Sequence, residues 1–326
     1  MIRFGVIGTG WIAEEFVKGA QLVDGLKFSA VYSRSREKGA AFAEPFGGAE
    51  IYDDINRFAE SDIDAVYIAS PNSLHYSQSK FMLENGKHVL CEKPITVTPD
   101  EFKEIRALAK SKKLVYTEAI MYLHLPARKI LLEQAKKLGK ITSAHFDFSQ
   151  LSSKYAALKR GELPNIFNPK FATGCLMDLG IYCIYPAIEL FGEPQKITAS
   201  SGFISTGADG YGTAIFDYDD KQITLTYSKL GQNRSGSMIC GDEGTIVLPS
   251  ISQLTEMSFY DNSGKKTEIS PDLEKHILMY YEAADFKKYI EKGTVDEEYE
   301  YFNDITEKVC NVMCEIRHSA KIKFDN

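Results

Sequence analysis

The stretch Gly5-Val6-Ile7-Gly8-Thr9-Gly10-Trp11-Ile12-Ala13 decides the fold of this chain. It joins an apolar run at residues 2–7 to a segment with helical spacing at residues 11–23. In a strand–turn–helix unit of this kind, the first glycine permits a tight turn, the second lets the backbone approach a pyrophosphate, and a small third residue lets the helix pack closely. The turn therefore predicts a dinucleotide site, with a glycine-dependent tight turn alone as the alternative. Its expected contacts are Gly8, Thr9, Gly10, Trp11 and Ile12.

The first third of the chain alternates between apolar runs and helical patterns. Runs without internal alternation at residues 2–7, 27–33, 64–69 and 87–91 predict strands buried on both faces of a parallel sheet. Helical spacing appears at residues 11–23, 36–44, 54–60, 73–85 and 99–111. This order is typical of a doubly wound α/β sheet. Residues 1–120 are therefore expected to form a Rossmann domain that binds NAD(P).

The pattern changes after Val115, which indicates a second domain at residues 121–326. Strands are predicted at residues 141–149, 196–204, 211–217, 222–229, 236–241 and 254–260. Helices are predicted at residues 126–138, 174–190, 276–291 and 298–318, with a long loop at residues 150–172. Strands grouped in this way favour an α+β domain with a largely antiparallel open sheet. We expect it to bind the substrate.

Composition narrows the class of protein. A net charge of -7 and a pI near 5.5 offer no basic surface for nucleic acid. The start of the chain lacks the pattern of a secretory leader, and no run approaches the roughly 20 apolar residues that cross a bilayer. The six cysteines form no metal-binding or disulfide framework. We therefore expect a cytoplasmic protein with reduced thiols, and neither a metal site nor a membrane partner.

The end of the second predicted strand bears on the choice between NAD and NADP. An acidic residue at this place would bind the free 2′-hydroxyl of the ribose. The chain instead has Ser33 and Arg34, followed by Ser35 and Arg36. A hydroxyl and a guanidinium suit a 2′-phosphate, so NADP(H) is favoured and NAD(H) stays open. The alternative is that both arginines are solvated charges at the start of a helix.

Two further turns follow predicted strands of the Rossmann domain. The first reads Ala69-Ser70-Pro71-Asn72-Ser73-Leu74-His75, in which Asn72 alone would read as a helix N-cap and His75 as a polar residue of the first turn. The second reads Cys91-Glu92-Lys93-Pro94 and lies at the carboxyl edge of the sheet, where ligands of such folds bind. An ammonium at this edge can stabilise negative charge that develops on a substrate oxygen.

Together these motifs resemble the glucose-fructose oxidoreductase, inositol dehydrogenase and rhizopine catabolism (Gfo/Idh/MocA) family of nicotinamide-dependent oxidoreductases. The resemblance implies that the PNxxH turn lies near the nicotinamide ribose and that the glutamate and proline of the EKP motif present the lysine to cofactor and substrate. The cofactor contacts implied after the glycine turn are Ser33, Arg34, Ser70, Asn72, His75, Glu92 and Lys93.

The segment Gly174-Cys175-Leu176-Met177-Asp178-Leu179-Gly180-Ile181-Tyr182 resembles the family's GGxxxDxGxH/Y helix. Asp178 and Tyr182 are four residues apart and share a helix face. The last position of the motif is tyrosine here, which resembles the motif of glucose-fructose oxidoreductase and dimeric dihydrodiol dehydrogenase. A phenol with a pKa of about 10 needs a cation nearby to act near neutrality, and Lys93 can supply it. We expect Tyr182 as acid/base, Lys93 as electrostatic assistant and Asp178 as an orienting residue; core packing of Tyr182 and helix capping by Asp178 are the alternatives.

Residues Glu118-Ala119-Ile120-Met121-Tyr122 resemble a family segment that carries a side chain toward the substrate. Leu123 and His124 follow, where many relatives have an arginine and an aromatic residue. Tyr122 and His124 are candidate substrate contacts, with interdomain packing as the alternative for either.

The motifs predict an oxidoreductase that moves a hydride between NADP(H) and a secondary alcohol or ketone of a sugar, cyclitol or diol. The family resemblance also implies a homodimer formed through the second-domain sheet. A non-catalytic dinucleotide sensor on the same fold is the alternative, but such a protein need not keep Lys93 and Tyr182. Pigment reduction of the biliverdin reductase type is disfavoured, because the sugar-type helix would have no evident use there.

Overall fold

The computed structural model describes residues 1–271 and 278–324, and its internal contacts divide these residues into two compact units. The first unit runs from Met1 to Met121 and includes residues 278–304. The second comprises residues 122–271 and 305–324. A late segment of the chain thus packs with the first unit. Its helix α10 (Leu278–Lys292) lies against α1 (Trp11–Ala20), where a Cβ on Gly19 would stand 2.7 Å from the backbone nitrogen of Tyr280.

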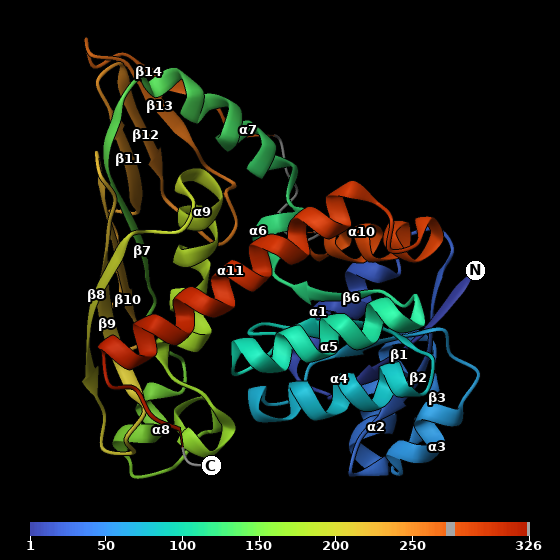
Figure 1. Ribbon diagram of the computed structural model, residues 1–326. Coiled ribbons are helices and arrows are strands. Elements are labelled where there is room, and N and C mark those ends of the chain that lie inside the picture. Colours follow the sequence, from blue (N-terminus) through green and yellow to red (C-terminus); the bar gives the residue numbers. More distant parts are fainter. Residues whose placement is uncertain (272–277, 325–326) are drawn as a thin grey trace. The chain divides into compact units, whose positions relative to one another are not determined.

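The first unit contains a six-stranded parallel sheet in the order β3-β2-β1-β4-β5-β6, which confirms the doubly wound prediction (Figure 1). Its strands are β1 (Ile2–Ile7), β2 (Leu26–Tyr32), β3 (Glu50–Tyr52), β4 (Ala65–Ile68), β5 (His88–Glu92) and β6 (Tyr116–Ala119). The central strand β4 is buried throughout, as expected of a sheet covered on both faces. Strand β3 was not predicted, because three residues that are exposed or half-buried give no apolar run.

Helices connect these strands and pack in groups. They are α2 (Arg36–Ala43), α3 (Ile55–Glu60), α4 (His75–Glu84) and α5 (Pro99–Lys112), with short 3-10 turns at Glu44–Phe46 and Asn72–Leu74. Helices α4 and α5 contact each other and appear together in front of the sheet in Figure 1. Helix α5 begins with a capping box formed by Thr98 and Glu101. The predicted start of α10 at residues 276–277 lies outside the described residues, and α11 (Glu297–Ser319) spans both units.

The second unit contains an eight-stranded sheet in the order β14-β13-β12-β11-β7-β10-β9-β8. Its strands are β7 (Ile141–Ser149), β8 (Lys196–Phe203), β9 (Asp209–Asp217), β10 (Gln222–Ser228), β11 (Ser237–Gly241), β12 (Gly244–Leu248), β13 (Ser258–Tyr260) and β14 (Lys266–Glu268). The pair β7–β10 is parallel and its neighbours are antiparallel, so the predicted architecture is confirmed. Burial alternates along β9 and β10, because helix α9 (Ile181–Phe191) covers one face.

Several predicted elements of this unit differ from the structure. The strand expected at residues 254–260 forms only at Ser258–Tyr260, because Leu254 adopts a φ of 52° and its amide bonds to Ser250 in a turn. Strands β12 and β14 were missed. The helix expected from residue 174 opens with a π-helical turn (Leu176–Gly180) before α9. The other helices are α6 (Met121–His124), α7 (Pro126–Ala135) and α8 (Tyr155–Lys159), and 3-10 turns lie at Lys136–Leu138, Asn165–Phe167 and Pro169–Phe171.

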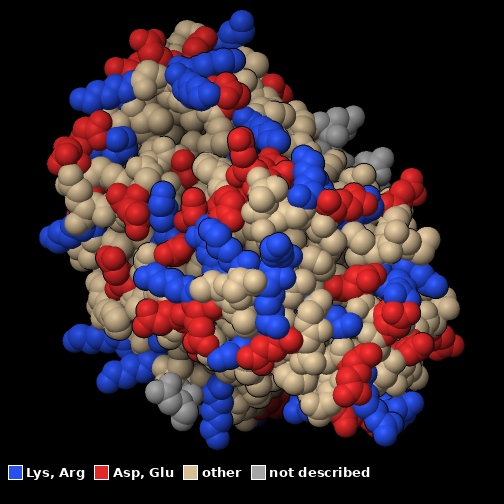
Figure 2. All heavy atoms as spheres, turned by 45° about the vertical axis from the view of Figure 1, so that its right-hand side comes forward, with Lys and Arg blue, Asp and Glu red and all other residues tan. Residues whose placement is uncertain are grey.

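One segment of the described chain, Pro169–Phe191, is long and apolar enough by composition to cross a bilayer. The segment includes the charged residues Lys170, Asp178 and Glu189, so it is no uninterrupted apolar run. In the structure 78% of the apolar window is buried, and Asp178 pairs with Lys229. Most of the window therefore lies in the core of the second unit. On the face of the molecule drawn in Figure 2, basic and acidic side chains are interspersed.

A buried ion pair ties α7 to α9 within the second unit. Arg128 Nη2 lies 2.5 Å from Glu189 Oε1, and both side chains are almost fully buried. The hydroxyl of Tyr122 donates to the same carboxylate at 2.7 Å. A buried charge that loses its partner is strongly destabilising.

We predict that Glu189→Ala lowers the free energy of unfolding by about 3–5 kcal/mol, because it removes the carboxylate that pairs with the buried Arg128 guanidinium. Tyr122→Phe removes one hydrogen bond and should cost about 1 kcal/mol. Urea unfolding followed by circular dichroism measures both changes. Equal losses for the two variants would show that the ion pair is not the dominant interaction.

Candidate active site

The glycine turn lies between β1 and α1, as predicted. Gly8 has a φ of 108°, and a Cβ at this position would stand 2.6 Å from the carbonyl oxygen of Ala69. The chain therefore requires glycine at residue 8, because the turns after β1 and β4 approach each other there. Ala13 is fully buried, which satisfies the need for a small residue in the helix.

Gly10 differs from Gly8 in the reason for its glycine. Its backbone is extended, with φ -86° and ψ 169°, and a Cβ would meet nothing within 4 Å. The protein's own packing thus does not require glycine at this position. Within residues 1–271 and 278–324, no protein group accepts a hydrogen bond from the amides of Thr9, Gly10 or Trp11. Open space beside backbone amides that donate to no protein group, at a helix N-terminus, fits the diphosphate of a dinucleotide.

Ser33 and Arg34 follow β2. The structure distinguishes Arg34 from Arg36 by their ion pairs, which the sequence alone did not reveal. Arg36 pairs with Asp53 at 3.2 Å, whereas Arg34 is exposed and has no ion pair with any other described residue. Ser33 Oγ accepts the amide of Ser35 at 3.3 Å, which fixes the turn. Arg34 is therefore the guanidinium that remains available to a 2′-phosphate.

The PNxxH turn is organised by a buried histidine. The His75 ring is fully buried; its Nδ1 lies 2.8 Å from the carbonyl oxygen of Pro94, and its Nε2 lies 2.8 Å from that of Ser70. Burial lowers the pKa of His75, while the two carbonyl groups oppose that shift. A neutral imidazole has one N–H and can donate to only one of these two carbonyl groups, so His75 lies between the two loops and bonds to one of them.

The other residues of this turn lie as follows. Ser70 Oγ donates to Gln78 Oε1 at 2.6 Å. Asn72 opens a 3-10 turn, and the N-cap of α4 is Leu74, so the capping alternative for Asn72 is wrong. The contact between His75 and Pro94 could not be predicted from local pattern, because it joins residues 19 positions apart.

The EKP motif lies at the end of β5, where the buried carboxyl groups of two glutamates accept hydrogen bonds from the backbone. The hydroxyl of Tyr67 donates to Glu92 Oε1, and the Lys93 amide donates to Glu92 Oε2 at 3.2 Å. Glu118 of β6 accepts the amide of Ile95 at 2.6 Å. These bonds fix the backbone on both sides of Lys93. Sequence reasoning placed Glu118 only within a family segment and missed this role.

Glu118 is fully buried, and burial raises its pKa to about 8, with a further increase from nearby Glu92. Burial also raises the pKa of Glu282 on α10 well above its ordinary value. A carboxyl group that stays protonated near neutral pH can hold the Ile95 amide without adding a negative charge beside Lys93.

In the second unit, Asp178 lies in the π-helical turn and pairs with a lysine that the sequence analysis did not identify. Lys229 Nζ lies 2.7 Å from Asp178 Oδ2, and the Lys229 side chain is 1% exposed. Lys229 follows β10, which ends beside β7. The pair orients Asp178 from within its own unit, and its only sequence signal was an isolated lysine after an apolar strand.

Asp209 bonds to the start of the same π-helical turn. It is fully buried, and its Oδ2 accepts the amide of Leu176 at 2.7 Å. Burial raises the pKa of Asp209, and the Lys229 charge opposes this shift. Gly174 is required here, because a Cβ would stand 1.8 Å from Asp209 Oδ1.

Tyr182 begins its helix half-buried, and its ring meets the ring of Phe148 edge-on at 5.3 Å between centroids. It is therefore not sealed in the core, unlike Tyr185 on the same helix, which is fully buried. Tyr122 and His124 are both buried, and the hydroxyl of Tyr122 donates to Glu189 within the second unit. In the described part of the chain, no group of three or more His, Cys, Asp or Glu side chains could hold a metal ion.

Comparisons with known proteins agree with this geometry. The description "Oxidoreductase family, NAD-binding Rossmann fold" of the GFO/IDH/MocA family matches residues 2–120, and the family's C-terminal domain matches residues 127–247. The fold and site define a dinucleotide-dependent oxidoreductase. The chain belongs to the GFO/IDH/MocA family.

Three similar proteins cover nearly the whole chain. Scyllo-inositol 2-dehydrogenase (NADP(+)) IolU of Bacillus subtilis is 38% identical over 91% of this chain and 91% of its own length. The oxidoreductase YgjR of Escherichia coli K12 is 37% identical over 99% of this chain and 98% of its own. The crystal structure of KijD10, a 3-ketoreductase from Actinomadura kijaniata in complex with NADP and TDP-benzene, matches 98% of each chain with a TM-score of 0.87 and 21% identity, and so supports the fold.

We predict that Gly10→Ala folds normally but binds NADPH at least about tenfold more weakly, because the added methyl group occupies the space of the diphosphate. Gly8→Ala should instead lower stability by about 1–3 kcal/mol through backbone strain and the Ala69 contact. Trp11, the chain's single tryptophan, reports binding by fluorescence, and urea unfolding reports stability. Unchanged NADPH binding by Gly10→Ala would contradict the assignment.

A second prediction concerns pH. The folded-state pKa of Glu118 is about 8 and its ordinary value is 4.5, so between these values the unfolded chain has released a proton that the folded chain keeps. Folding stability of the wild type therefore falls as pH rises through this window. Glu118→Gln has no proton to lose, so its stability relative to wild type should increase from about pH 5 to about pH 8.5. The negative charge of Glu118 also raises the pKa of Glu282, so the substitution lowers the pKa of Glu282 and shifts the difference between the two proteins in the same direction. Urea unfolding at both pH values measures the difference, and a constant difference would show that Glu118 is ionised in the folded state.

Proposed function

We propose that this protein is an NADP(H)-dependent oxidoreductase that interconverts a secondary alcohol and a ketone on a sugar, cyclitol or diol. In this proposal residues 1–120 bind the dinucleotide, and residues 121–326 bind the substrate and form the dimer. The main observation in support is the open space at Gly10, beside backbone amides that donate to no described group. The chain is also 38% identical to scyllo-inositol 2-dehydrogenase (NADP(+)) IolU.

The cofactor contacts follow the turns of the first unit. The proposed set is Gly8, Thr9, Gly10, Trp11, Ile12, Ser33, Arg34, Ser70, Asn72, Glu92 and Lys93, with His75 holding the loops. NADP(H) is favoured because Arg34 is exposed and unengaged by other described residues, and because similar dehydrogenases from Bacillus subtilis and Hypocrea jecorina are named for NADP(+). NAD(H) remains the alternative cofactor.

The chemistry assigned to this chain is proton transfer and charge stabilisation. When bound, the nicotinamide ring donates or accepts the hydride. Tyr182 gives a proton to the substrate oxygen during ketone reduction and takes it back during alcohol oxidation. The Lys93 ammonium stabilises negative charge on that oxygen. Asp178, held by Lys229, orients the substrate hydroxyl groups.

The substrate class rests on the similar proteins. Their names include scyllo-inositol 2-dehydrogenase, trans-1,2-dihydrobenzene-1,2-diol dehydrogenase and D-xylose 1-dehydrogenase. All of these compounds carry neighbouring hydroxyl groups on a ring, which suits an aspartate fixed beside a tyrosine. Tyr122 and His124 are the weaker substrate candidates, because both side chains are buried.

The assembly and the location of the protein are further parts of the proposal. The face of the second-unit sheet opposite α9 carries the exposed side chains of Tyr211 and Met238. Such apolar groups suit contact with a second copy, so we propose a homodimer through this face. All six cysteines are free thiols, which supports a cytoplasmic location.

Turnover tests the function. In a panel of inositols, aldoses and cyclic diols with NADP+ followed by absorbance, we expect activity on at least one member. Tyr182→Phe and Lys93→Met should each lower kcat by about 100-fold or more while NADPH binding persists. Tyr260→Phe is the matched control, because it removes a hydroxyl on β13 that bonds to no other described residue. NADPH binding without turnover of any panel member would favour the sensor alternative.

A further inference from the structure

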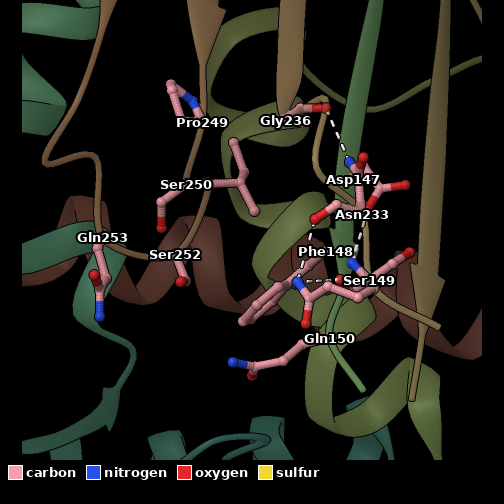
Figure 3. Close-up of a pocket in the computed structure, with 12 residues that line it drawn as sticks. Asp147, Phe148, Ser149, Gln150, Asn233, Gly236, Pro249, Ser250, Ser252 and Gln253 are labelled. Atoms are coloured by element: carbon pink, nitrogen blue, oxygen red, sulfur yellow. Dashed lines mark hydrogen bonds between the residues drawn. The ribbon is translucent and has the colours of Figure 1, made fainter. Parts of the chain in front are cut away.

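A cavity of about 260 Å³ lies in the second unit at one end of its sheet. It forms where β7 and β12 end and β11 begins (Figure 3). In Figure 3 the loop with Ser250, Ser252 and Gln253 stands on one side of the cavity, and Phe148 and Gln150 stand near the end of β7 on the other. This volume is slightly below the range of about 300–1,000 Å³ for pockets that enclose drug-sized ligands, so the cavity can hold at most one small ring as part of a larger ligand.

The polar side chains of the cavity are largely unused by the protein. Ser149, Gln150, Ser250, Ser252 and Gln253 line it, and their side chains bond to no group in the described ranges. Each hydroxyl and each amide can both donate and accept hydrogen bonds. By contrast, the side-chain amides of Asn233 and Gln232 donate to backbone carbonyl oxygens of the cavity wall.

Charge narrows the class of ligand further. The cavity lining holds one carboxylate and no lysine, arginine or histidine, so it offers no partner to a phosphate or a carboxylate. That carboxylate, Asp147, is 8% exposed; its Oδ1 accepts the Ser149 amide at 2.7 Å, and its Oδ2 lies 3.9 Å from His145 Nε2. Successive side chains of a strand point to opposite faces of the sheet, so the Asp147 carboxylate shares its face with His145 and lies on the side opposite Phe148. The phenyl ring of Phe148 supplies an apolar wall.

The cavity adjoins the residues assigned to chemistry in the same unit. Phe148 lines it and also packs edge-on against Tyr182. The Gln150 amide donates to the carbonyl oxygen of Ser228 at 2.8 Å, next to Lys229, which holds Asp178. A ligand in the cavity would thus lie one aromatic ring away from Tyr182.

We propose that this cavity is a recognition pocket for the neutral, polyhydroxylated part of the substrate that lies away from the reacting carbon. Its unengaged amides and hydroxyls bond to ring hydroxyl groups, and Phe148 packs against the apolar face of the ring. The proposal rests on the proposed function for the identity of its ligand as substrate. It selects polyols and sugars over simple diols and over phosphorylated sugars.

Single substitutions test the pocket. Gln150→Ala and Gln253→Ala should each raise KM for the active polyol by about two- to tenfold, the range expected for one lost hydrogen bond. The value of kcat at saturation and the Kd for NADPH should stay within about twofold, which a general structural defect would not allow. Gln195→Ala is the matched control, because this amide is exposed just before β8 and does not line the cavity. Ser252→Trp, which fills the cavity, should raise KM further.

The outcomes separate this proposal from the proposed function. Unchanged KM in Gln150→Ala, Gln253→Ala and Ser252→Trp, in an enzyme that is active, would overturn the pocket and leave the function standing. If no alcohol is turned over, the function fails and the pocket is read by calorimetry with myo-inositol and D-glucose. Heat of binding that is lost in Ser252→Trp would then support the pocket, and no heat with either probe would overturn it.

Discussion

The buried ring of His75 holds together the two loops on which the first unit's site depends. It faces the carbonyl oxygen of Ser70 after β4 and that of Pro94 after β5. The Gly8 turn closes against Ala69 from the other side, and Glu118 fixes Ile95. A buried polar group is costly unless it is hydrogen-bonded, so the burial of the His75 ring favours the arrangement in which its N–H donates to one of these carbonyl groups. The phosphate-binding turn and the lysine loop therefore keep a fixed spacing.

The second unit is organised around a different constraint, the buried ammonium of Lys229. An ion pair with one member almost fully buried is weak evidence for stability, because desolvation offsets much of the attraction. Its position suggests a role in the site: it fixes Asp178 in a π-helical turn, one turn before Tyr182. Such turns are frequent at functional sites. The cavity lies at the same end of the sheet, and Phe148 lines it and contacts Tyr182. The proposed acid/base residue and the proposed recognition pocket are therefore neighbours within the second unit.

The sequence predicted the parts of this account that depend on local pattern. Alternating apolar runs and helical spacing identified the parallel sheet, and glycine spacing identified the turn at Gly8. Contacts between distant residues could not be predicted in this way. The brace by His75, the pairing of Asp178 with Lys229 and the choice between Arg34 and Arg36 depend on which side chains the fold brings together. The cavity near Ser250 also escaped notice, because serine and glutamine in a loop carry no pattern of their own.

The proposed chemistry depends on the binding of NADP(H) at the turn after β1. Trp11 stands at this turn, is 73% exposed and is the only tryptophan of the chain, so its fluorescence reports binding there directly. The most direct test is titration of the wild-type protein with NADPH and with NADH while Trp11 emission is followed. We expect saturable quenching by both, with NADPH at least about tenfold tighter because of Arg34. An unchanged Trp11 emission with both dinucleotides would show that this turn is not a dinucleotide site.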